Sequence, residues 1–489
     1  MGSLHRWSNE PVGIARWGQG FLGEWRSRDC AETEHQKLQN PYDYLKGVIA
    51  TLLETPSPTE QSQLARYSIC AGSPRIINGQ QQLWTPPLGQ ILPFLKRLLR
   101  RGTGAEGHRS RGAEEQRKIN LQPPIDHLPF TGGWLGWLGY DLAWEIEQLP
   151  RLKDDSLPFP IAYWYEPATF AVLDHLKQTL WLAATQTTEL DQLQNQLDSS
   201  LGTRNSSPLT PSFLTSQADY ENAVRQAKKY IHAGDIFQAN LSLRFQVSTT
   251  ADSWAIYRAL QTINPSPFAS FWQTPWGAVI SCSPERLIKL EERHSQTRPI
   301  AGTRSRGATP AQDQQLAQEL TANSKENAEH IMLVDLERND LGRVCEWGSV
   351  KVEELFTIEY YSHVMHLVSN IVGCLRTDYD GIELIRALFP GGTITGCPKV
   401  RCLEIIEELE PLRRSLFYGS CGYLDWRGHL DLNIIIRTLL FANHHSGLNR
   451  VWGQVGAGIV ADSDPEKEWY ESLNKAQAQL AALRIATQS

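Results

Sequence analysis

The sequence contains no apolar run long enough to cross a membrane. Its 489 residues include no stretch of the roughly 18 consecutive apolar residues that a membrane-spanning helix needs. Residues 1–7 also lack the apolar segment of a secretory signal. We therefore expect a protein that does not contact membranes and has a cytoplasmic location.

Paired cysteines and a sustained basic stripe are missing as well. The eight cysteines are scattered, with no C-x-x-C pair, so they indicate reduced thiols and not a disulfide framework or a zinc site. The net charge of -7 argues against nucleic acid as a partner. The sequence contains 41% hydrophobic and 21% charged residues, which is the balance of a soluble globular protein.

Two polar stretches, residues 101–120 and 198–212, interrupt the more regular parts of the chain. The second is rich in Ser, Gly and Pro, as linkers are. It separates an irregular N-terminal region (1–200) from a second region (214–485) in which helix and strand periodicities are clearer.

In the second region, the spacing of apolar residues predicts an α+β fold. A helix over residues 220–232 is preceded by Ser216 and ended by Gly234, and Asp464-Pro465 opens a final helix. Further helices are expected at residues 312–334 and 400–409. Strands are expected at residues 236–245, 277–288 with a break at Ser283-Pro284, 352–356, 366–372, 418–426, 434–441 and 450–456.

Two pairs of glutamates repeat one spacing. Glu326 and Glu329 lie three residues apart on the expected long helix, and Glu468 and Glu471 do so on the final helix. Each pair therefore shares a helix face. Four carboxylates brought together would repel one another unless a hard cation such as Mg2+ lay between them. By spacing alone, solvent-exposed helix faces are the simpler explanation.

Several other features suit an anionic ligand, and each has an ordinary alternative. The glycine-rich turn over residues 389–399, with Thr393, offers N–H and hydroxyl groups before a helix, as an ordinary helix-entry turn also does. Residues 456–458 end a strand with glycines that permit close approach of a ligand. Arg437 follows an apolar run and needs a carboxylate from a ligand or from the protein. His366 is either a satisfied core residue or an acid-base group.

Seven motifs occur in a fixed order: residues 234–238, 283–285, 298–304, 328–336, 338–340, 391–399 and 458–463. Together they resemble the large subunit of the chorismate-utilising enzymes, which include anthranilate, aminodeoxychorismate, isochorismate and salicylate synthases. The resemblance covers the chain from Ser216 to the C-terminus and, more weakly, the N-terminal region. It implies an anthranilate synthase component I-like fold of two large antiparallel sheets packed together, with helices outside and the site in a cleft between the sheets. Residues 214–485 would then form the chorismate-binding catalytic domain.

The resemblance also assigns roles to individual residues. Glu329 and Glu471 match the Mg2+ ligands of the family, with Glu326 and Glu468 in the same cluster, and the metal would hold the ring carboxylate of chorismate. The groups that match chorismate-binding residues are Gly302, Thr303, Arg437, Gly456, Ala457, Gly458 and Lys475. The catalytic candidates are Glu285, an acid near the C4 hydroxyl, His366, implicated in loss of the pyruvyl group, Gln238 and Thr393.

Two positions bear on which reaction is catalysed. Family members that add water carry a lysine base where Gln238 stands, and a glutamine cannot deprotonate water, so the resemblance favours amination. Well-known aminodeoxychorismate synthases carry a nucleophilic lysine at position 301, whereas this chain has Ala301, as anthranilate synthases do. The stretches that look more like aminodeoxychorismate synthase are residues 240–242, 267–268, 283–287, 394–396 and 431–434.

We therefore predict component I of an aminodeoxychorismate synthase, which converts chorismate and ammonia to 4-amino-4-deoxychorismate for 4-aminobenzoate and folate synthesis. The alternative is anthranilate synthase component I, which serves tryptophan synthesis, and a third is a non-catalytic regulator that binds chorismate or tryptophan. The sequence shows no Cys-His-Glu amidotransferase module, so ammonia would come from a separate glutamine amidotransferase subunit.

Two departures from the family pattern remain. The tyrosine that contacts substrate in the family aligns with Phe417, and Tyr418 is adjacent. Tryptophan-regulated members have Leu-Leu-Glu-Ser and Pro-Tyr-Met motifs that differ from the corresponding residues here. A tryptophan pocket, partly built by the N-terminal region (1–200), would involve Thr55, Pro267, Phe268 and Ala269, with feedback inhibition left open.

Overall fold

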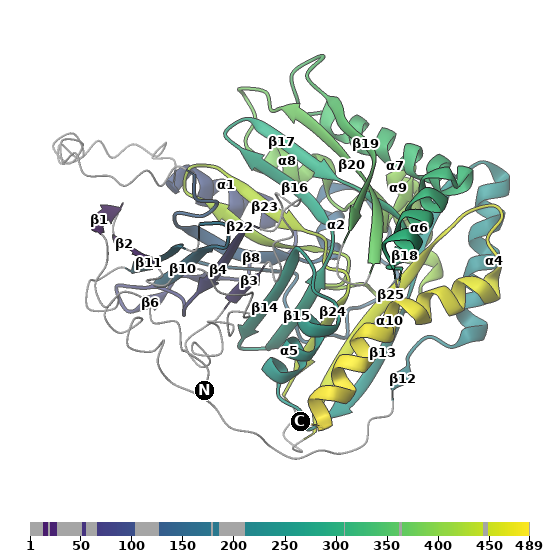
Figure 1. The fold of residues 1–489 in the computed structure, drawn as a ribbon, viewed down its shortest axis with the longest axis horizontal. Coiled ribbons are helices and arrows are strands. Elements are labelled where there is room, and N and C mark those ends of the chain that lie inside the picture. Colours follow the sequence, from purple (N-terminus) through teal and green to yellow (C-terminus); the bar gives the residue numbers. More distant parts are fainter. Residues whose placement is uncertain are drawn as a thin grey trace.

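The computed structural model describes residues 13–17, 20–26, 51–54, 66–102, 127–177, 179–184, 211–307, 309–360, 364–443 and 448–488. These residues form two large antiparallel sheets with helices around them, so the expected fold class is confirmed (Figure 1). None of the helices in the described ranges is long and apolar enough to span a bilayer.

The first sheet combines strands from both ends of the sequence. Its neighbours run in the order β1 (Gly13–Trp17), β2 (Gly20–Arg26), β11 (Thr179–Ala184), β10 (Thr169–Asp174), β4 (Tyr67–Ala71), β3 (Thr51–Glu54), β14 (Phe268–Thr274), β15 (Gly277–Ser283), β24 (Thr438–Ala442), β25 (Asn449–Ile459), β13 (Gln238–Thr249) and β12 (Ser212–Phe213), and β21 (Gly396–Cys397) also pairs with β13.

The second sheet is built in the same way. Its order is β18 (Ile300–Ser305), β20 (Val364–Cys374), β17 (His294–Arg298), β16 (Arg286–Glu291), β23 (Leu430–Asn433), β22 (Ser420–Asp425), β8 (Gly133–Leu138), β9 (Ala162–Tyr165) and β7 (Leu83–Trp84), with β19 (Lys351–Tyr360) also paired with β20. A separate hairpin joins β5 (Ile76–Ile77) and β6 (Gln80–Gln81).

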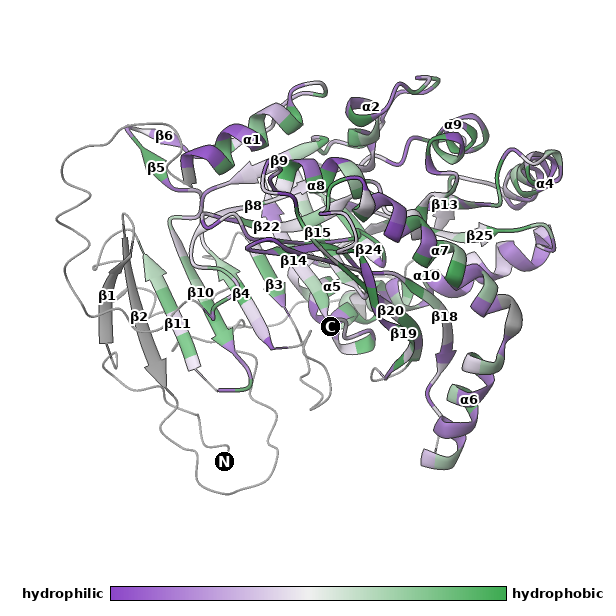
Figure 2. Ribbon diagram, turned by 90° about the horizontal axis from the view of Figure 1, so that it is seen from above, coloured by the Kyte–Doolittle hydropathy of each residue, from purple (hydrophilic) through white to green (hydrophobic). Residues whose placement is uncertain are grey.

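The described parts of the N-terminal region (1–200) extend both sheets. In the first sheet, β3 pairs with β14, with Leu53 opposite Ser270. In the second, β8 pairs with β22, with Gly136 opposite Gly422. Figure 2 shows β11, β10, β4, β3 and β14 side by side as one continuous sheet.

The helices are α1 (Ile91–Gly102), α2 (Ala143–Ile146), α4 (Gln217–Ala233), α5 (Ser253–Ile263), α6 (Pro310–Ala322), α7 (Ser324–Gly342), α8 (Gly381–Leu388), α9 (Lys399–Leu409) and α10 (Pro465–Gln488), with short 3-10 turns η4 (Tyr140–Leu142) and η5 (Gly392–Ile394). Helix α4 begins and ends as predicted. Ser216 accepts a hydrogen bond from the N–H of Asp219 at 3.1 Å, and Gly234 adopts a φ of 83°.

Two apolar clusters hold the layers together. Between the sheets, Trp137 of β8 packs edge-on against Trp272 of β14, with ring centroids 5.9 Å apart. The opposite face of the first sheet buries Leu241 and Val455 against α4, α5 and α10. The first sheet is thus covered by the second sheet on one face and by helices on the other.

Two expected elements are wrong. The single helix at residues 312–334 is two helices, because Asn323 leaves the helical conformation (φ -72°, ψ 102°) and its side chain accepts a hydrogen bond from the N–H of Glu326. The strand expected at residues 434–441 begins only at Thr438, as β24, because residues 434–437 connect it to β23, which ends at Asn433, with Arg437 at a φ of 52°.

Candidate active site

The predicted site residues come from both sheets and from the turns that join them. One part is the start of β13, where Gln238 and Asn240 lie on one face of the strand because side chains alternate. Gly458 of β25 pairs with Asn240, and a Cβ atom at Gly458 would lie 2.4 Å from Nε2 of Gln238. Glycine at 458 therefore leaves space for the Gln238 side chain.

Two acceptor atoms at this end of β13 have no hydrogen-bond partner among the described residues. They are Oε1 of Gln238 and Oδ1 of Asn240, and both are buried. The amide group of Asn240 donates to the carbonyl of Thr393 at 3.3 Å, which joins β13 to the glycine-rich turn. Buried acceptors without partners are costly, so these atoms fit contact with a bound polar ligand.

Glu285 lies at the break between β15 and β16 that the sequence predicts. Its side chain is only 4% exposed, and the N–H of Ile300 donates to its Oε1 at 3.4 Å. Burial raises the pKa of Glu285 to about 8, although Thr393, Ile300 and Arg437 favour its charged form. At neutral pH Glu285 is therefore protonated and can donate a proton.

Arg437 occupies the break between β23 and β24. Its φ of 52° is a left-handed conformation that an arginine rarely adopts, and such strain is concentrated at functional sites. Burial lowers its pKa, while Tyr418, Glu285 and Glu471 favour the cation. A buried guanidinium in these surroundings suits a bidentate pair with a ligand carboxylate.

His366 and Thr303 face each other across β20 and β18. The hydroxyl oxygen of Thr303 lies 2.9 Å from Nδ1 of His366. Burial, together with the positive charge of Arg437, lowers the pKa of His366 to about 4. The imidazole is therefore neutral at physiological pH and available to accept a proton. Gly302 beside it has a φ of 63°.

The four glutamates predicted to bind metal lie on α7 and α10, and different residues surround Glu326, Glu468 and Glu471. Arg304 donates to Oε1 of Glu326 at 2.7 Å, and Oε2 of Glu326 is buried without a partner among the described residues. Lys475 lies 2.8 Å from Glu471, which is 55% exposed, and also donates to the carbonyl of Gly456. Glu468 is buried and close enough to Tyr220 of α4 to raise its pKa, after the larger effect of burial.

Within the described ranges, no group of three or more Asp, Glu, His or Cys side chains is placed to hold a metal ion. The donor chemistry nevertheless fits Mg2+, because carboxylate oxygens are its preferred protein ligands. The unpartnered Oε2 of Glu326 is one such oxygen. Because the four glutamates are not gathered into one metal site among the described residues, their role as Mg2+ ligands, including that of half-buried Glu329, stays a prediction from the sequence.

Tyr418, and not Phe417, lies beside Arg437. The ring of Phe417 is buried under the guanidinium of Arg244, 5.5 Å from its centroid. Tyr418 has a φ of 65°, and its charge interaction with Arg437 places it at the site. The adjacent tyrosine is thus the one in position to contact a ligand.

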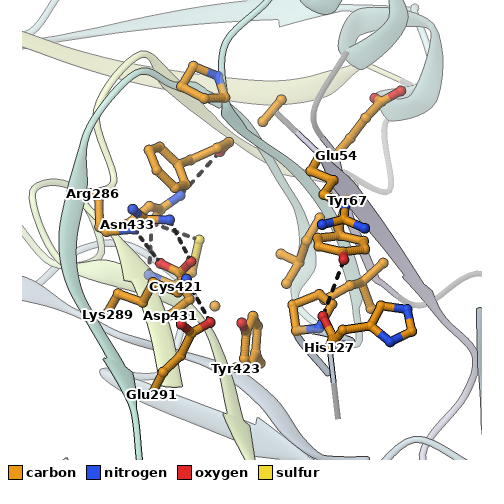
Figure 3. Close-up of a pocket in the computed structure, with 18 residues that line it drawn as sticks. Glu54, Tyr67, His127, Arg286, Lys289, Glu291, Cys421, Tyr423, Asp431 and Asn433 are labelled. Atoms are coloured by element: carbon orange, nitrogen blue, oxygen red, sulfur yellow. Dashed lines mark hydrogen bonds and ion pairs between the residues drawn. The ribbon is translucent and has the colours of Figure 1, made fainter. Parts of the chain in front are cut away.

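A separate pocket of about 160 Å3 lies between β14, β16, β22 and β4 (Figure 3). Pro267, Phe268 and Ala269 line it, Thr55 lies outside the described residues, and tryptophan binding here stays a prediction. Figure 3 shows Arg286, Lys289, Glu291 and Asp431 on one side and Glu54, Tyr67 and His127 on the other. A cavity of roughly this size can hold a benzene-sized group.

Sequence reasoning missed Glu337, a buried carboxylate on α7 whose Oε1 accepts a hydrogen bond from the N–H of Gly392. The helical spacing in the sequence could have indicated this residue. Glu337 follows Glu326 by eleven residues, close to three turns of helix, so it lies on the same face as that glutamate.

Comparisons with known proteins agree with this geometry. A family model described as chorismate binding enzyme matches residues 83–481. An anthranilate synthase component I-like protein of Synechocystis sp. is 60% identical over 485 residues, covering 97% of this chain and 95% of that protein. Aminodeoxychorismate synthase component 1 of Bacillus subtilis is 44% identical over 371 residues, covering 73% and 78%. Anthranilate synthase component 1 of the same Synechocystis strain is 41% identical over 409 residues, covering 76% and 79%.

A solved structure gives the same result for the fold. The crystal structure of anthranilate synthase component I from Streptococcus pneumoniae superposes with a TM-score of 0.71 and 29% sequence identity, covering 92% of this chain and 100% of that one. The likeness therefore extends through both sheets.

Proposed function

Since the chain belongs to the chorismate binding enzyme family, and is a chorismate-utilising enzyme, we propose that it aminates chorismate to 4-amino-4-deoxychorismate as component I of an aminodeoxychorismate synthase. The observation that carries amination is the combination of Glu285, a buried acid, with Gln238, a neutral amide. A proton donor for the C4 hydroxyl is present, and the amide offers no base that would activate water.

Sequence identity alone does not divide the two reactions, because aminodeoxychorismate synthase component 1 of B. subtilis and anthranilate synthase component 1 of Thermus thermophilus are both 44% identical to the chain. Synechocystis holds one protein named anthranilate synthase component 1, at 41% identity to this chain, and another named only anthranilate synthase component I-like, at 60%. The chain is closer to the second.

One observation favours anthranilate synthase instead. Ala301 of β18, opposite Leu367, carries no nucleophile. A covalent lysine intermediate at C2 is therefore excluded at this position, and C4 amination requires direct attack by ammonia or another directing group.

In the proposed reaction, Arg437 binds a carboxylate of chorismate and so orients the ring. Protonated Glu285 gives its proton to the C4 hydroxyl, the C4–O bond breaks and water leaves. Ammonia forms the new C4–N bond, and the resulting ammonium returns one proton to the Glu285 carboxylate, which restores the acid. The glutamates 326, 329, 468 and 471 would hold Mg2+, which supplies positive charge to the ring carboxylate when bound. His366, neutral beside Thr303, would accept a proton only if pyruvate were lost.

The test incubates purified protein with chorismate, Mg2+ and an ammonium salt, with and without an added aminodeoxychorismate lyase. Formation of 4-aminobenzoate only with the lyase supports C4 amination. Anthranilate and pyruvate without the lyase would identify the alternative reaction, and Ala301 would be the decisive residue. The two products are isomers of the same mass, and their fluorescence and chromatographic retention distinguish them.

The ammonia donor is proposed to be a separate glutamine amidotransferase, because the relatives are named as component 1 or component I of two-component enzymes. Ammonium salt should then sustain turnover by the chain alone, whereas glutamine should do so only after the partner subunit is added. Glutamine-dependent product from the isolated chain would contradict this.

The pocket lined by Phe268 is proposed as a tryptophan site. Its aromatic and apolar walls suit an indole ring, and Glu54 offers a carboxylate for an amino group. Calorimetric titration with tryptophan tests binding, and the ammonia-dependent assay shows whether binding inhibits. A Phe268→Ala variant that binds equally well would argue against this pocket.

A further inference from the structure

Glu337 is a buried carboxylate that links three separate elements around the site. It belongs to α7 and is 3% exposed. Its Oε1 accepts a hydrogen bond from the N–H of Gly392 at 3.3 Å, and its Oε2 accepts one from the hydroxyl of Thr297 at 3.2 Å. A single side chain thus joins α7 to the glycine-rich turn and to the end of β17.

The glycine-rich turn and the start of β18, which directly follows β17, also contact Glu285. Thr393, directly after Gly392, lies beside the Glu285 carboxyl, and the N–H of Ile300, three residues after Thr297, donates to it. A Cβ atom at Gly392 would lie 2.5 Å from Leu336 and 3.2 Å from Oε1 of Glu337. The turn therefore rests directly on α7, and a shift of Glu337 would be transmitted to both groups that contact Glu285.

We propose that Glu337 is a positioning residue for the acid Glu285, because it fixes the Gly392–Thr393 turn and the β17–β18 connection at the spacing that holds the Glu285 carboxyl. This inference rests on the proposed function, in which Glu285 protonates the departing C4 hydroxyl. A displacement of about 1 Å at such a group can reduce a rate by roughly 100-fold.

The charges around Glu337 are arranged so that it affects Glu285 electrostatically as well. Lys399 at the start of α9 donates to Asp340 at 2.5 Å and to the carbonyl of Leu388. Burial raises the pKa of Glu337 to about 7, with Lys399 opposing and Asp340 adding to the shift. Arg437 is the cation facing Glu285. Ionised Glu337 raises the pKa of Glu285 and so helps it keep its proton.

Two substitutions at Glu337 separate its hydrogen bonds from its charge. In Glu337→Gln, Oε1 can still accept from Gly392 and Nε2 can donate to the Thr297 hydroxyl, so both links persist without the charge. We expect kcat within about fivefold of wild type at the optimum, since geometry is kept. The alkaline limb of the pH profile should move to lower pH, because Glu285 loses the negative neighbour that favours its protonated form.

Glu337→Ala removes both links. We expect kcat to fall by about 10- to 100-fold, with the KM for chorismate changed by less than about threefold, because Arg437 and the carboxylate-binding groups are untouched. Glu407→Gln is the matched control. Glu407 is a buried glutamate on α9 that accepts a hydrogen bond from the backbone N–H of Leu152, on the N-terminal side of the molecule. It should lower thermal stability without moving the pH profile.

Thr297→Val provides a second route that does not depend on the folding of Glu337→Ala. It removes one of the two links and keeps the shape of a side chain that is 2% exposed. We expect a loss in kcat of about three- to tenfold, and no further loss when it is combined with Glu337→Ala, because both changes break the same link. Thr297→Val at wild-type kcat, or additive losses in the double variant, would overturn the proposal.

The experiments distinguish a failure of the proposed role of Glu337 from a failure of the proposed function. Wild-type protein that fails to consume chorismate with ammonium and Mg2+ would reject the function itself. Active wild type, together with Glu337→Ala at wild-type kcat or with an alkaline limb in Glu337→Gln that does not move, would reject only the role of Glu337. Either amination product serves for this measurement, since the C4 hydroxyl leaves in both.

Discussion

Two buried residues of the site, Glu285 and His366, have pKa values displaced in opposite directions. Burial raises the pKa of Glu285 to about 8 and lowers that of His366 to about 4, since in each case it disfavours the charged form. At pH 7 Glu285 is protonated and can donate a proton, whereas His366 is neutral and can accept one. Such divergence identifies acid and base roles at active sites. A sequence alone indicates neither burial nor these shifts.

Glu285→Gln should remove the proton donor and leave the fold. We expect kcat to fall by about 100- to 10,000-fold, the range for loss of a general acid, with little change in KM. The wild-type profile of kcat should lose activity above about pH 8, where Glu285 ionises. Glu319→Gln, on the exposed surface of α6, is the control. A Glu285→Gln variant with normal turnover would show that another group protonates the hydroxyl.

The same residue should make stability depend on pH. Its folded pKa of about 8 lies above the ordinary 4.5. Between these values the folded carboxyl keeps a proton that the unfolded chain has lost. The contribution of the protonated carboxyl to the free energy of unfolding is therefore complete below pH 4.5 and is lost as pH rises through 8. The unfolding free energy of Glu285→Gln minus that of wild type should increase by roughly 1–4 kcal/mol from pH 5 to pH 8. Urea unfolding of both proteins at the two pH values measures this, and an unchanged difference would contradict the burial argument.

At the scale of elements, the pairing of β13 with β25 sets the position of Gln238. A Cβ atom at Gly458 would lie 2.4 Å from Nε2 of Gln238, which is closer than real contacts allow. Gly458→Ala should therefore displace the amide and reduce kcat by at least about tenfold while the two strands remain paired. Circular dichroism and thermal unfolding check the fold. In Gly428→Ala, by contrast, the added Cβ meets nothing within 4 Å, and activity should be kept although the backbone φ of 89° costs stability.

Local signals predicted the elements whose boundaries have local causes. The caps of α4 at Ser216 and Gly234 and the break at Ser283-Pro284 were read correctly because each depends on neighbouring residues. The breaks at Asn323 and Arg437 were missed. The apolar run before Arg437 continues the strand pattern, and only the surrounding structure holds that residue at a left-handed φ.

At the scale of the whole molecule, long-range pairing joins the N-terminal region (1–200) to the catalytic strands. Periodicity shows that strands exist and not which strands are neighbours, so the β3–β14 and β8–β22 pairs could not be derived from spacing. The family resemblance supplied the architecture of two sheets. It also indicated the residues that the fold gathers around Arg437, such as Glu285 and His366, which lie 81 residues apart in sequence.

Helix α10, at the C-terminal end of the chain, carries Glu471 and Lys475 of the proposed site. Glu471 lies close enough to Arg437 to favour its cation, and pairs with Lys475 at 2.8 Å. Glu471→Gln can keep the hydrogen bond from Lys475 but loses the charge of a proposed Mg2+ ligand. It should therefore reduce Mg2+-dependent turnover by at least about 100-fold, since a bound metal contributes several kcal/mol. Calorimetric titration with Mg2+ and chorismate should show weaker binding in the variant.

Glu466→Gln is the matched control, because it is exposed in the first turn of the same helix and belongs to neither glutamate pair. Glu466→Gln should bind Mg2+ and chorismate in the calorimetric titration, and turn chorismate over, as wild type does. If Glu471→Gln also retained full Mg2+-dependent activity, Glu471 would not be a ligand. If wild-type protein bound chorismate without turnover in either the presence or absence of Mg2+, the chain would instead act as a regulator, and Glu471 would serve to hold Lys475 against the carbonyl of Gly456 in β25.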